Sequence, residues 1–455
     1  MSSERQAPYA LRAGALAPPM EWAPQPPASS RPNFQSRLAL LTGVWTASGV
    51  AIYVVAPLTA PALLGLAVIA PLAWCWMEGR LPWRTPSAAV AGLAVAGAYI
   101  LINASWSLSP AEAYTTAALF FAGIGVLHVT ATGLSNTPAP ALRAMALGLL
   151  VGMAVGAAVL CFELLSDQWL RRLLATYHLG LRPNDRHMQV EAGRVTLLQP
   201  YLLNRSMAAL GLTFWPALLV LERLAMSSRQ RGLLLSGLLL TPVAILVSQH
   251  GTSKMAFAGA AATYGVGRLS PLLAKRLLIA GWLAATLLVA PIVALAYSNQ
   301  LHLVRWLDNS VRHRIVIWEY TKNEIAKAPM LGTGISTSRA LHSTDLEGVP
   351  REPGTDFPLA LALHSHNGYL QVWHEAGAVG AVLLLVLGLL ILRAIAAKPP
   401  ALQPHFYAMF AACALVAASS YSIWAPWFMS ALALTPVFAG IGAALLARGE
   451  KEPSS

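Results

Sequence analysis

The residues best suited to chemistry lie in one stretch, where a long polar segment gives way to a long apolar one. It reads Leu363-His-Ser-His366-Asn-Gly-Tyr-Leu-Gln-Val-Trp373-His374-Glu375-Ala-Gly377-Ala-Val-Gly380. If a helix starts here, Ser365 is a good N-cap, and His366 shares one face with Leu370, Trp373, Gly377 and Gly380. An imidazole beside free N–H groups at a helix N-terminus suits a neutral base that works next to an anionic ligand.

The composition is that of a membrane protein. The 455 residues are 56% apolar and only 11% charged, and the mean hydropathy is +0.57. Apolar runs of about 20 residues recur along the chain, as in a polytopic helical protein. The net charge of +12 leaves no basic face once these runs are set aside. We therefore expect membrane lipids, and no nucleic acid, among the partners.

The fold class that follows is an all-α polytopic membrane protein with about 12 transmembrane helices. The predicted spans are 38–57, 59–78, 87–106, 112–134, 143–165, 203–222, 231–248, 254–271, 276–297, 366–393, 404–421 and 424–447. The chain then divides into a disordered N-terminal tail (1–37), spans one to nine (38–297, with an outer loop at 166–202), a large outer loop between spans nine and ten (298–365), spans ten to twelve (366–447) and a C-terminal tail (448–455).

Charge sets the orientation. With the N-terminus inside, 17 of the 31 basic residues fall in inner segments, and the short outer loops carry almost none except Lys254. The positive-inside rule therefore predicts that both termini are cytoplasmic and that His366 faces the outer side.

The large outer loop is predicted to contain a helix that lies on the membrane surface or on the bundle. An apolar stripe runs through Val311, Ile315, Trp318 and Ile325, and Pro329 and the Gly332-Thr-Gly334 turn end it. Four basic residues lie near outer ends of spans or on this helix, namely Arg205, Lys254, Arg312 and Arg314. Guanidinium groups there suit diphosphate oxygens, although for any single arginine snorkelling toward lipid headgroups is the better explanation.

Other kinds of chemistry find little support. The two imidazoles of His364 and His366 could begin a metal site, but the nearest further ligands, Glu352 and Asp356, have no recognisable spacing. We expect no metal and no cofactor. Glu375 is predicted to hydrogen-bond a neighbouring span, His374 to be structural, and the chain has no Gly-x-Ser-x-Gly motif for a serine nucleophile.

These residues resemble a known family. His366-Asn367, nine residues and then Gly377-Ala-Val-Gly380 match the His-Asn-x9-Gly-x-x-Gly signature of O-antigen ligases and the related O-antigen polymerases. Upstream, the run from Arg312 to Trp318 and the Pro329-Met-Leu-Gly-Thr-Gly334 turn resemble the block that precedes the signature. Thr252-Ser-Lys254 resembles the Ser-Arg start of a span, with lysine in place of arginine, and Asn204-Arg205 falls at an Asn-rich span start.

The resemblance implies a C-type glycosyltransferase-like fold in the bacterial inner membrane, with the active site periplasmic. The donor would be an undecaprenyl-diphosphate-linked glycan, transferred en bloc with inversion to a lipid A–core acceptor during lipopolysaccharide biosynthesis. His366 would be the general base, and Arg314 or Arg312 would hold the diphosphate. Arg205 would assist, Lys254 would do so more weakly because lysine lacks a bidentate fork, and Asn367, His364 and Trp318 would support the site.

Three alternatives remain. An O-antigen polymerase, which extends the undecaprenyl-linked chain, shares the signature. A protein O-oligosaccharyltransferase often carries a soluble piece after the last span, and here only about eight residues follow Ala447. A transporter of lipid-linked glycan should have similar halves and charged or broken spans, which this chain lacks.

Overall fold

The computed structural model describes residues 31–79, 85–179, 187–341, 349–360 and 363–448. The tails predicted at 1–37 and 448–455 therefore lie mostly outside the described residues. The first helix nevertheless begins at Arg31, inside the segment that was predicted to be a disordered tail.

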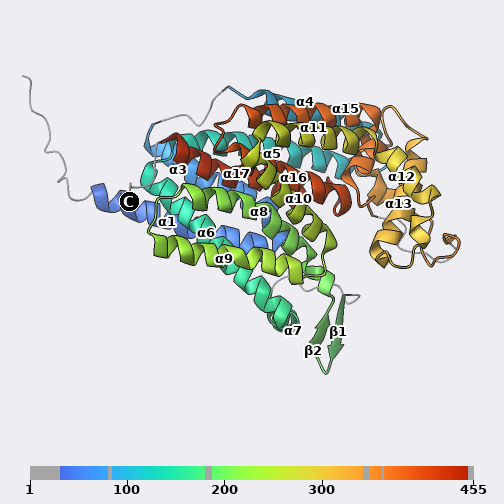
Figure 1. Ribbon diagram of the computed structural model, residues 1–455, viewed down its shortest axis with the longest axis horizontal. Coiled ribbons are helices and arrows are strands. Elements are labelled where there is room, and N and C mark those ends of the chain that lie inside the picture. Colours follow the sequence, from blue (N-terminus) through green and yellow to red (C-terminus); the bar gives the residue numbers. More distant parts are fainter. Residues whose placement is uncertain (1–30, 80–84, 180–186, 342–348, 361–362, 449–455) are drawn as a thin grey trace, which may run out of the picture.

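The described chain is almost entirely helical (Figure 1). Its elements are α1 (Arg31–Val55), α2 (Ala60–Ala67), α3 (Ile69–Met77), α4 (Ala88–Asn103), α5 (Pro110–Asn136), α6 (Ala139–Leu165), α7 (Trp169–Thr176), β1 (Met188–Glu191), β2 (Arg194–Leu198), α8 (Asn204–Arg223), α9 (Ser228–Val247), α10 (Gly251–Leu269), α11 (Pro271–Leu287), α12 (Val289–Ser298), α13 (Asn309–Ile325), α14 (Thr337–Leu341), α15 (Gly368–Ala396), α16 (Gln403–Ser419) and α17 (Pro426–Ala447).

An all-α polytopic membrane protein is the right class. Within the described chain, 8 helical segments are long and apolar enough to cross a membrane, or up to 9 if the bent pair α11 and α12 forms one span. Each of the twelve predicted spans coincides with a helix or with a pair of helices. Three of them, α8, α10 and α16, fall short of the length and composition of a span, so the number twelve stays a prediction.

The centre of the bundle is α8, most of whose residues are buried, including Trp215 and the helix-interior Pro216. Around it pack α6, α9, α10, α16 and α17. The close pairing of α1 with α6 depends on glycines at intervals of four, since a Cβ at Gly148, Gly152 or Gly156 would overlap α1. Small residues at this spacing let two membrane helices approach closely.

The predicted ninth span is broken. Helix α11 ends at Leu287, and α12 leaves it at an angle of 69°. The chain then turns through a short 3-10 helix at Leu301–Leu303 into α13, the predicted helix of the large loop. Both α12 and α13 lie at one end of the bundle, next to the start of α15 (Figure 1).

Helix α13 rests on the bundle. Trp318 and Ile325 pack against Val289, Tyr369 and Leu370, and Ile315 is buried. Val311, which was predicted to share this stripe, is exposed instead, because the first turn of α13 extends beyond the helices beneath it. The apolar stripe thus predicted the helix correctly and its buried face only in part.

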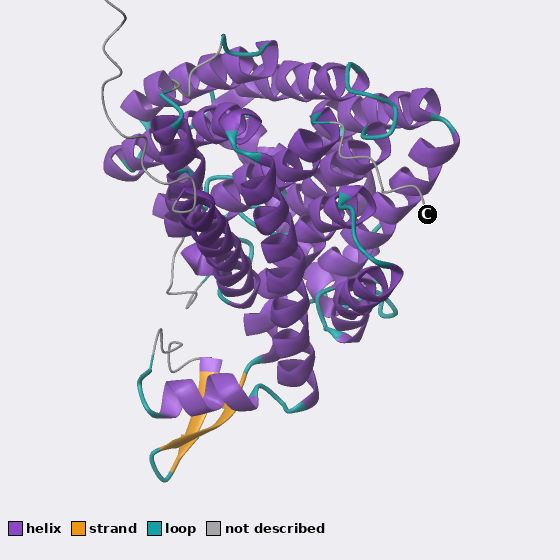
Figure 2. Ribbon diagram, turned by 90° about the vertical axis from the view of Figure 1, so that its left-hand side faces the viewer, coloured by secondary structure: helices purple, strands orange, loops and turns teal. Residues whose placement is uncertain are grey.

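The first outer loop contains a structure that the sequence did not suggest. After α7, strands β1 and β2 pair antiparallel around the turn Ala192-Gly193, whose residues both have positive φ. The hairpin projects from the helices (Figure 2). Arg171 fixes α7 to the bundle by donating hydrogen bonds to the Val55 and Leu202 carbonyls at 2.7 and 3.2 Å. This loop adds a small β element to an otherwise helical fold.

Candidate functional site

His366 lies just before α15 and not on it. Helix α15 begins at Gly368, and its N-cap is Asn367, whose Oδ1 accepts hydrogen bonds from the backbone of Tyr369 and Leu370 at 3.0 and 3.1 Å. The prediction of Ser365 as the N-cap is therefore wrong, and so is the placing of His366 on the helix face. Ser365 instead donates to the Asn367 carbonyl at 2.6 Å and shapes the turn that precedes the helix.

The backbone fixes the orientation of the His366 ring. Its φ of 53° lies in the left-handed region, which is uncommon for a residue with a side chain and marks a constrained position. Nδ1 lies 3.0 Å from the Ser420 carbonyl. A carbonyl oxygen only accepts, so Nδ1 carries the proton in the neutral ring and Nε2 has a free lone pair. Nothing among the described residues bonds to Nε2. This tautomer suits a base.

The environment keeps His366 neutral. Burial of the ring, followed by the positive charge of Arg314, lowers the pKa of His366 to about 4. The His364 ring lies next to it, tilted by 49° with ring centroids 4.1 Å apart, and its Nδ1 accepts the His366 backbone N–H at 3.1 Å. Burial, then the charges of His366, Arg339, Arg314 and Arg205, lower the pKa of His364 to about 3. Both imidazoles are therefore neutral near pH 7.

Arg314 is the cation that faces this pair. It projects from α13, its side chain is half-buried, and burial lowers its pKa. After burial, its positive charge is one of the causes that lower the pKa values of four histidines, namely His250, His313, His364 and His366. No hydrogen bond or ion pair joins its guanidinium to any part of the chain that the structure describes. A half-buried cation without a partner is costly, and an anionic ligand would relieve that cost.

Arg312 is engaged elsewhere. Its Nε donates to the His302 carbonyl at 2.8 Å, and its guanidinium lies 5.6 Å from the centre of the Phe357 ring. His302 in turn contacts the buried Glu352 at 3.3 Å. The structure thus separates the two arginines of the motif, since the charge of Arg314 acts on His366 and the side chain of Arg312 contacts the loop that follows α12. The Trp318 side chain, on the buried face of α13, packs against the bundle and stabilises the position of this helix.

Arg205 and Lys254 differ in how near they come. Arg205 is exposed in the first turn of α8. After burial, its charge is one of the causes that shift the pKa values of His364 and Tyr421. Lys254 lies half-buried in the first turn of α10. Its charge is not among the causes that lower the pKa values of His250, His364 and His366. The charges of Arg314 and Arg205 thus both act on His364, and Arg314 also acts on His366.

Four residues of this cluster were missed by the sequence reasoning. The loop between α16 and α17 supplies Ser420, whose carbonyl orients His366, and Tyr421, whose buried hydroxyl has no partner among the described groups. His250 bonds Ser253 at 2.6 Å and Ser420 Oγ at 3.2 Å, which joins the start of α10 to the same loop. His313 lies beside Arg314 on α13 and faces Phe357. The polar runs Gln249-His250 and Ser419-Ser420-Tyr421-Ser422, each between two apolar runs, were the available signal.

The glycines of the motif bring two chain segments into backbone contact. Within α15, Gly377 has φ 64° and ψ −164°, which breaks the helix. There the turn around Gly332 docks, with Ala378 N–H donating to the Pro329 carbonyl at 2.9 Å and Gly334 N–H to the Glu375 carbonyl at 2.9 Å. A Cβ on Gly332 or Gly377 would overlap the opposite backbone. This junction fixes the loop that carries α13 onto the helix that His366 precedes.

Glu375 and His374 serve this junction. The Glu375 carboxylate is buried and accepts from Trp424 Nε1 at 2.6 Å and from the Ser336 backbone at 2.9 Å. It also accepts from the Ser338 backbone at 3.2 Å and from Gln371 Nε2 at 3.3 Å. Since Trp424 is the first residue of the last predicted span, the predicted hydrogen bond to a neighbouring span holds in part, and the loop around Ser336 is an additional partner. His374 Nδ1 bonds Ser338 Oγ at 3.2 Å. Asn103 of α4 completes the junction, with its amide donating to the Leu331 carbonyl at 2.9 Å.

No group of three or more His, Cys, Asp or Glu side chains suited to a metal ion occurs in the described ranges. His364 and His366 are close, but the nearest predicted third ligand, Glu352, is bound to His302 and to the Tyr297 hydroxyl, at 3.3 and 2.7 Å. The cluster can thus offer a neutral base and cationic donors.

Comparison with known proteins places this site in context. Residues 236–385 match the family model described as O-antigen ligase. A Rickettsia conorii protein named "Putative polysaccharide ligase" is 29% identical over 239 residues, which are 50% of this chain and 55% of that protein. Its namesake from Rickettsia felis is 30% identical over 234 residues, 50% of this chain and 56% of that one. The chain thus spans about half the length of the curated relatives it matches. The matched residues 236–385 contain Lys254, Arg314 and His366 together, and the resemblance of this chain to the O-antigen ligase family is confirmed.

Proposed function

We propose that the protein is a glycosyltransferase of the O-antigen ligase type. It moves a glycan en bloc from undecaprenyl diphosphate to the lipid A–core oligosaccharide on the periplasmic side of the inner membrane. The single observation that carries this proposal is a neutral His366 whose Nε2 has no partner among the described residues, together with Arg314, whose guanidinium also lacks one there and whose charge acts on His366. The names of the relatives, polysaccharide ligases, agree with a glycosyl-transferring enzyme.

The chemistry asks for little more. An acceptor hydroxyl gives its proton to His366 Nε2, and its oxygen attacks the anomeric carbon of the donor from the side opposite the diphosphate. The bond between that carbon and the diphosphate oxygen breaks, the electron pair stays on the lipid diphosphate, and the configuration inverts. Diphosphate is already a good leaving group, so the enzyme supplies orientation, charge stabilisation and one proton acceptor.

We propose that Arg314, Arg205 and Tyr421 together bind the diphosphate. The two guanidinium groups provide charge-assisted hydrogen bonds, and the buried Tyr421 hydroxyl provides a donor that has no other partner among the described residues. Arg312 is left out of this role because His302 and Phe357 already hold it. Lys254 stays a weaker, outer contact, and Asn367, His364 and Trp318 position the groups that act.

The pH dependence of kcat/KM should reflect the lowered pKa of His366. Because this pKa is about 4, the base stays deprotonated down to acidic pH, and the acidic limb has its midpoint near that value. The activity of the free enzyme should thus change little between about pH 6 and pH 8. In Arg314→Gln, loss of the nearby positive charge raises the His366 pKa, and the limb moves to higher pH. Lys254→Gln is the matched control and leaves the limb in place.

A wild-type limb centred at the ordinary histidine pKa of about 6.5 would contradict this account of His366. So would an equal shift of the limb in both variants, because the effect would then be one of total charge and not of the contact between Arg314 and His366.

The acceptor distinguishes a ligase from a polymerase. We expect purified protein, supplied with undecaprenyl-diphosphate-linked glycan, to form product only when lipid A–core is added. Mass spectrometry of the lipid fraction identifies the product. Growth of the undecaprenyl-linked chain without lipid A–core would assign the polymerase activity instead. Glycan attached to a protein acceptor would assign the third alternative, and movement of the lipid across vesicles independent of His366 would assign transport.

A further inference from the structure

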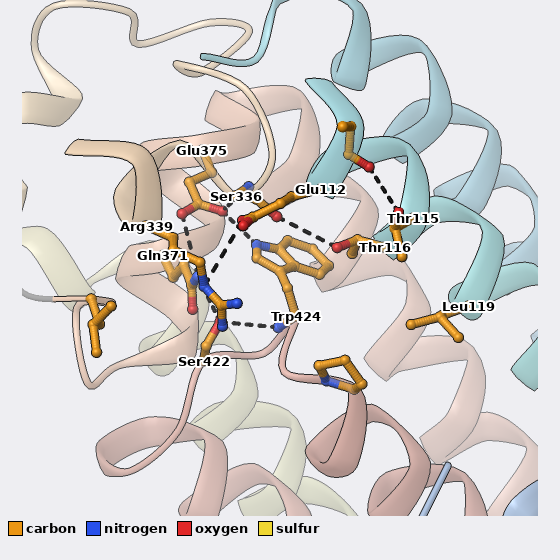
Figure 3. Close-up of a pocket in the computed structure, with 13 residues that line it drawn as sticks. Glu112, Thr115, Thr116, Leu119, Ser336, Arg339, Gln371, Glu375, Ser422 and Trp424 are labelled. Carbon is orange, nitrogen blue, oxygen red and sulfur yellow. Dashed lines mark hydrogen bonds and ion pairs between the residues drawn. The ribbon is translucent and has the colours of Figure 1, made fainter. Parts of the chain in front are cut away.

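A pocket lies against the loop between α16 and α17, which supplies Ser422 and Trp424 to its lining (Figure 3). Its volume is about 270 Å³, just below the range of roughly 300–1,000 Å³ that is usual for small-molecule sites. Four segments line it, namely the first turns of α5, the residues around Ser336 and Arg339, the start of α15, and the loop before α17. These segments lie far apart in the sequence, and the Gly332–Gly377 junction brings two of them together.

The pocket is built next to the proposed catalytic group. Ser420, whose carbonyl orients His366, belongs to the loop that also supplies Ser422 and Trp424 to the pocket. Gln371 anchors this loop, because its Nε2 donates to Ser422 Oγ at 2.9 Å and its Oε1 accepts from the Ile423 backbone at 3.1 Å. The charge of Arg339, at the rim of the pocket, is also one of the causes, after burial, that lower the pKa of His364. The pocket and the histidine pair are therefore connected through the loop between α16 and α17.

The lining is polar, with one aromatic wall. Trp424 donates through Nε1 to the buried Glu375, which fixes the indole and leaves its ring to line the pocket (Figure 3). Hydroxyl groups come from Thr115, Thr116 and Ser422. At the rim, Glu112 and Arg339 are about half exposed and only loosely paired, with 3.9 Å between Oε2 and Nε. Both can therefore turn to a ligand.

This combination fits a sugar ring. A carboxylate, a guanidinium and several hydroxyls match adjacent sugar hydroxyls, and an indole offers an apolar face for the ring carbons. Two carboxylates against one guanidinium disfavour a diphosphate, and so many polar groups disfavour a lipid tail. The donor diphosphate has its own cations on the α13 side. We propose that this pocket binds the terminal sugar of the lipid A–core acceptor and presents its hydroxyl to His366, an inference that rests on the proposed function.

Photo-crosslinking tests the occupant directly. p-Benzoylphenylalanine is placed at Leu119, which lines the pocket, and at the matched control Tyr114, which is exposed on the same helix but does not line it. Purified full-length protein is irradiated with rough lipopolysaccharide, which carries lipid A–core alone. We expect crosslinks at Leu119 at least about fivefold above those at Tyr114, and suppression of them by delipidated core oligosaccharide.

Equal labelling at both positions overturns the proposal, because the probe would then report only lipid around the helix. Crosslinks to the undecaprenyl-linked donor glycan, or competition by undecaprenyl diphosphate alone, overturn it as well. If core oligosaccharide suppresses the crosslinks but the protein shows no transfer activity, the result supports the pocket and counts against the proposed function. If the protein transfers glycan but the pocket is not labelled, the result supports the proposed function and counts against the pocket.

Kinetics provide the second readout. In Arg339→Ala, the KM for lipid A–core should rise about tenfold, the loss of one or two hydrogen bonds to a charged group, with kcat and the donor KM changed less than about threefold. Lys327→Ala is the control, since Lys327 is exposed and pairs only with Glu324 of the preceding helix. A rise in donor KM, or the same effect in the control, contradicts an acceptor site.

Discussion

Replacement of His366 by alanine is expected to lower kcat by about 10²–10⁴-fold, the range that a positioned general base contributes. Among the described residues, the ring makes one hydrogen bond, to the Ser420 carbonyl, and it lies outside the helix, so its loss removes the proton acceptor with little effect on the fold. The donor KM should stay close to that of the wild type. Purified protein with both lipid substrates gives these values, and cells carrying the variant should accumulate undecaprenyl-linked glycan.

His364→Ala is the matched control for this prediction. His364 accepts the His366 backbone N–H and its ring contacts that of His366, so its loss should disturb the position of the base and lower kcat by about tenfold at most. Unchanged transfer in the His366 variant would remove it as the base. A larger loss in the His364 variant than in the His366 variant would exchange the two roles.

Replacement of Arg314 by alanine is the second change with a large expected effect. The guanidinium is half-buried, has no protein partner in the described chain, and faces His366, so it can act on charge that develops on the departing diphosphate. Removal of one such donor from a preorganised site commonly costs about 10²–10³ in kcat. Arg314→Lys keeps the charge but not the bidentate fork and should recover part of the loss. Steady-state kinetics on the purified variants measure both.

Arg312 provides the contrast within the same helix. Its side chain donates a hydrogen bond to the His302 carbonyl and lies over the Phe357 ring. Arg312→Ala should therefore lower the melting temperature, and it should lower kcat much less than Arg314→Ala does. If Arg312→Ala and Arg314→Ala lose activity equally while both remain stable, the division of roles between the two arginines is wrong.

Long-range features of this molecule could be predicted from its composition, and local features of the site could not. Apolar runs determine which segments become helices, because backbone groups in a membrane must bond within their own segment. The same pattern placed the α13 helix through Ile315 and Trp318. It could not indicate that Val311 projects beyond the bundle, since the position of a helix end depends on what lies beneath it.

The start of α15 illustrates the limit most clearly. Ser365 and Asn367 are both residue types that favour the N-cap position. Because His366 between them has a left-handed backbone conformation, Asn367 and not Ser365 caps the helix. That conformation follows from the Ser420 carbonyl, which is 54 residues further along the chain. The family motif singled out His366, whose role stays a prediction, but it could not show that Ser420, Tyr421 and His250, from the loops before α17 and α10, belong to the same cluster. Only the folded chain brings them to one place.

The glycines show the opposite case. The turn at Gly332-Thr-Gly334 and the break at Gly377 each look unremarkable in sequence, and the turn was correctly predicted. That the two meet, with Thr333 N–H donating to the His374 carbonyl at 3.0 Å, explains why both positions lack a Cβ. Backbone contacts of this kind leave no periodic pattern in a single sequence.

A structure with the donor bound tests the central claim most directly. The protein carrying His366→Ala, which should bind the donor without turning it over, can be imaged by cryo-electron microscopy with undecaprenyl-diphosphate-linked glycan. The account predicts diphosphate oxygens at hydrogen-bond distance, about 2.7–2.9 Å, from the Arg314 guanidinium, with the anomeric carbon facing the place of the missing imidazole. A diphosphate bound away from Arg314, or an anomeric carbon turned away from residue 366, would contradict it.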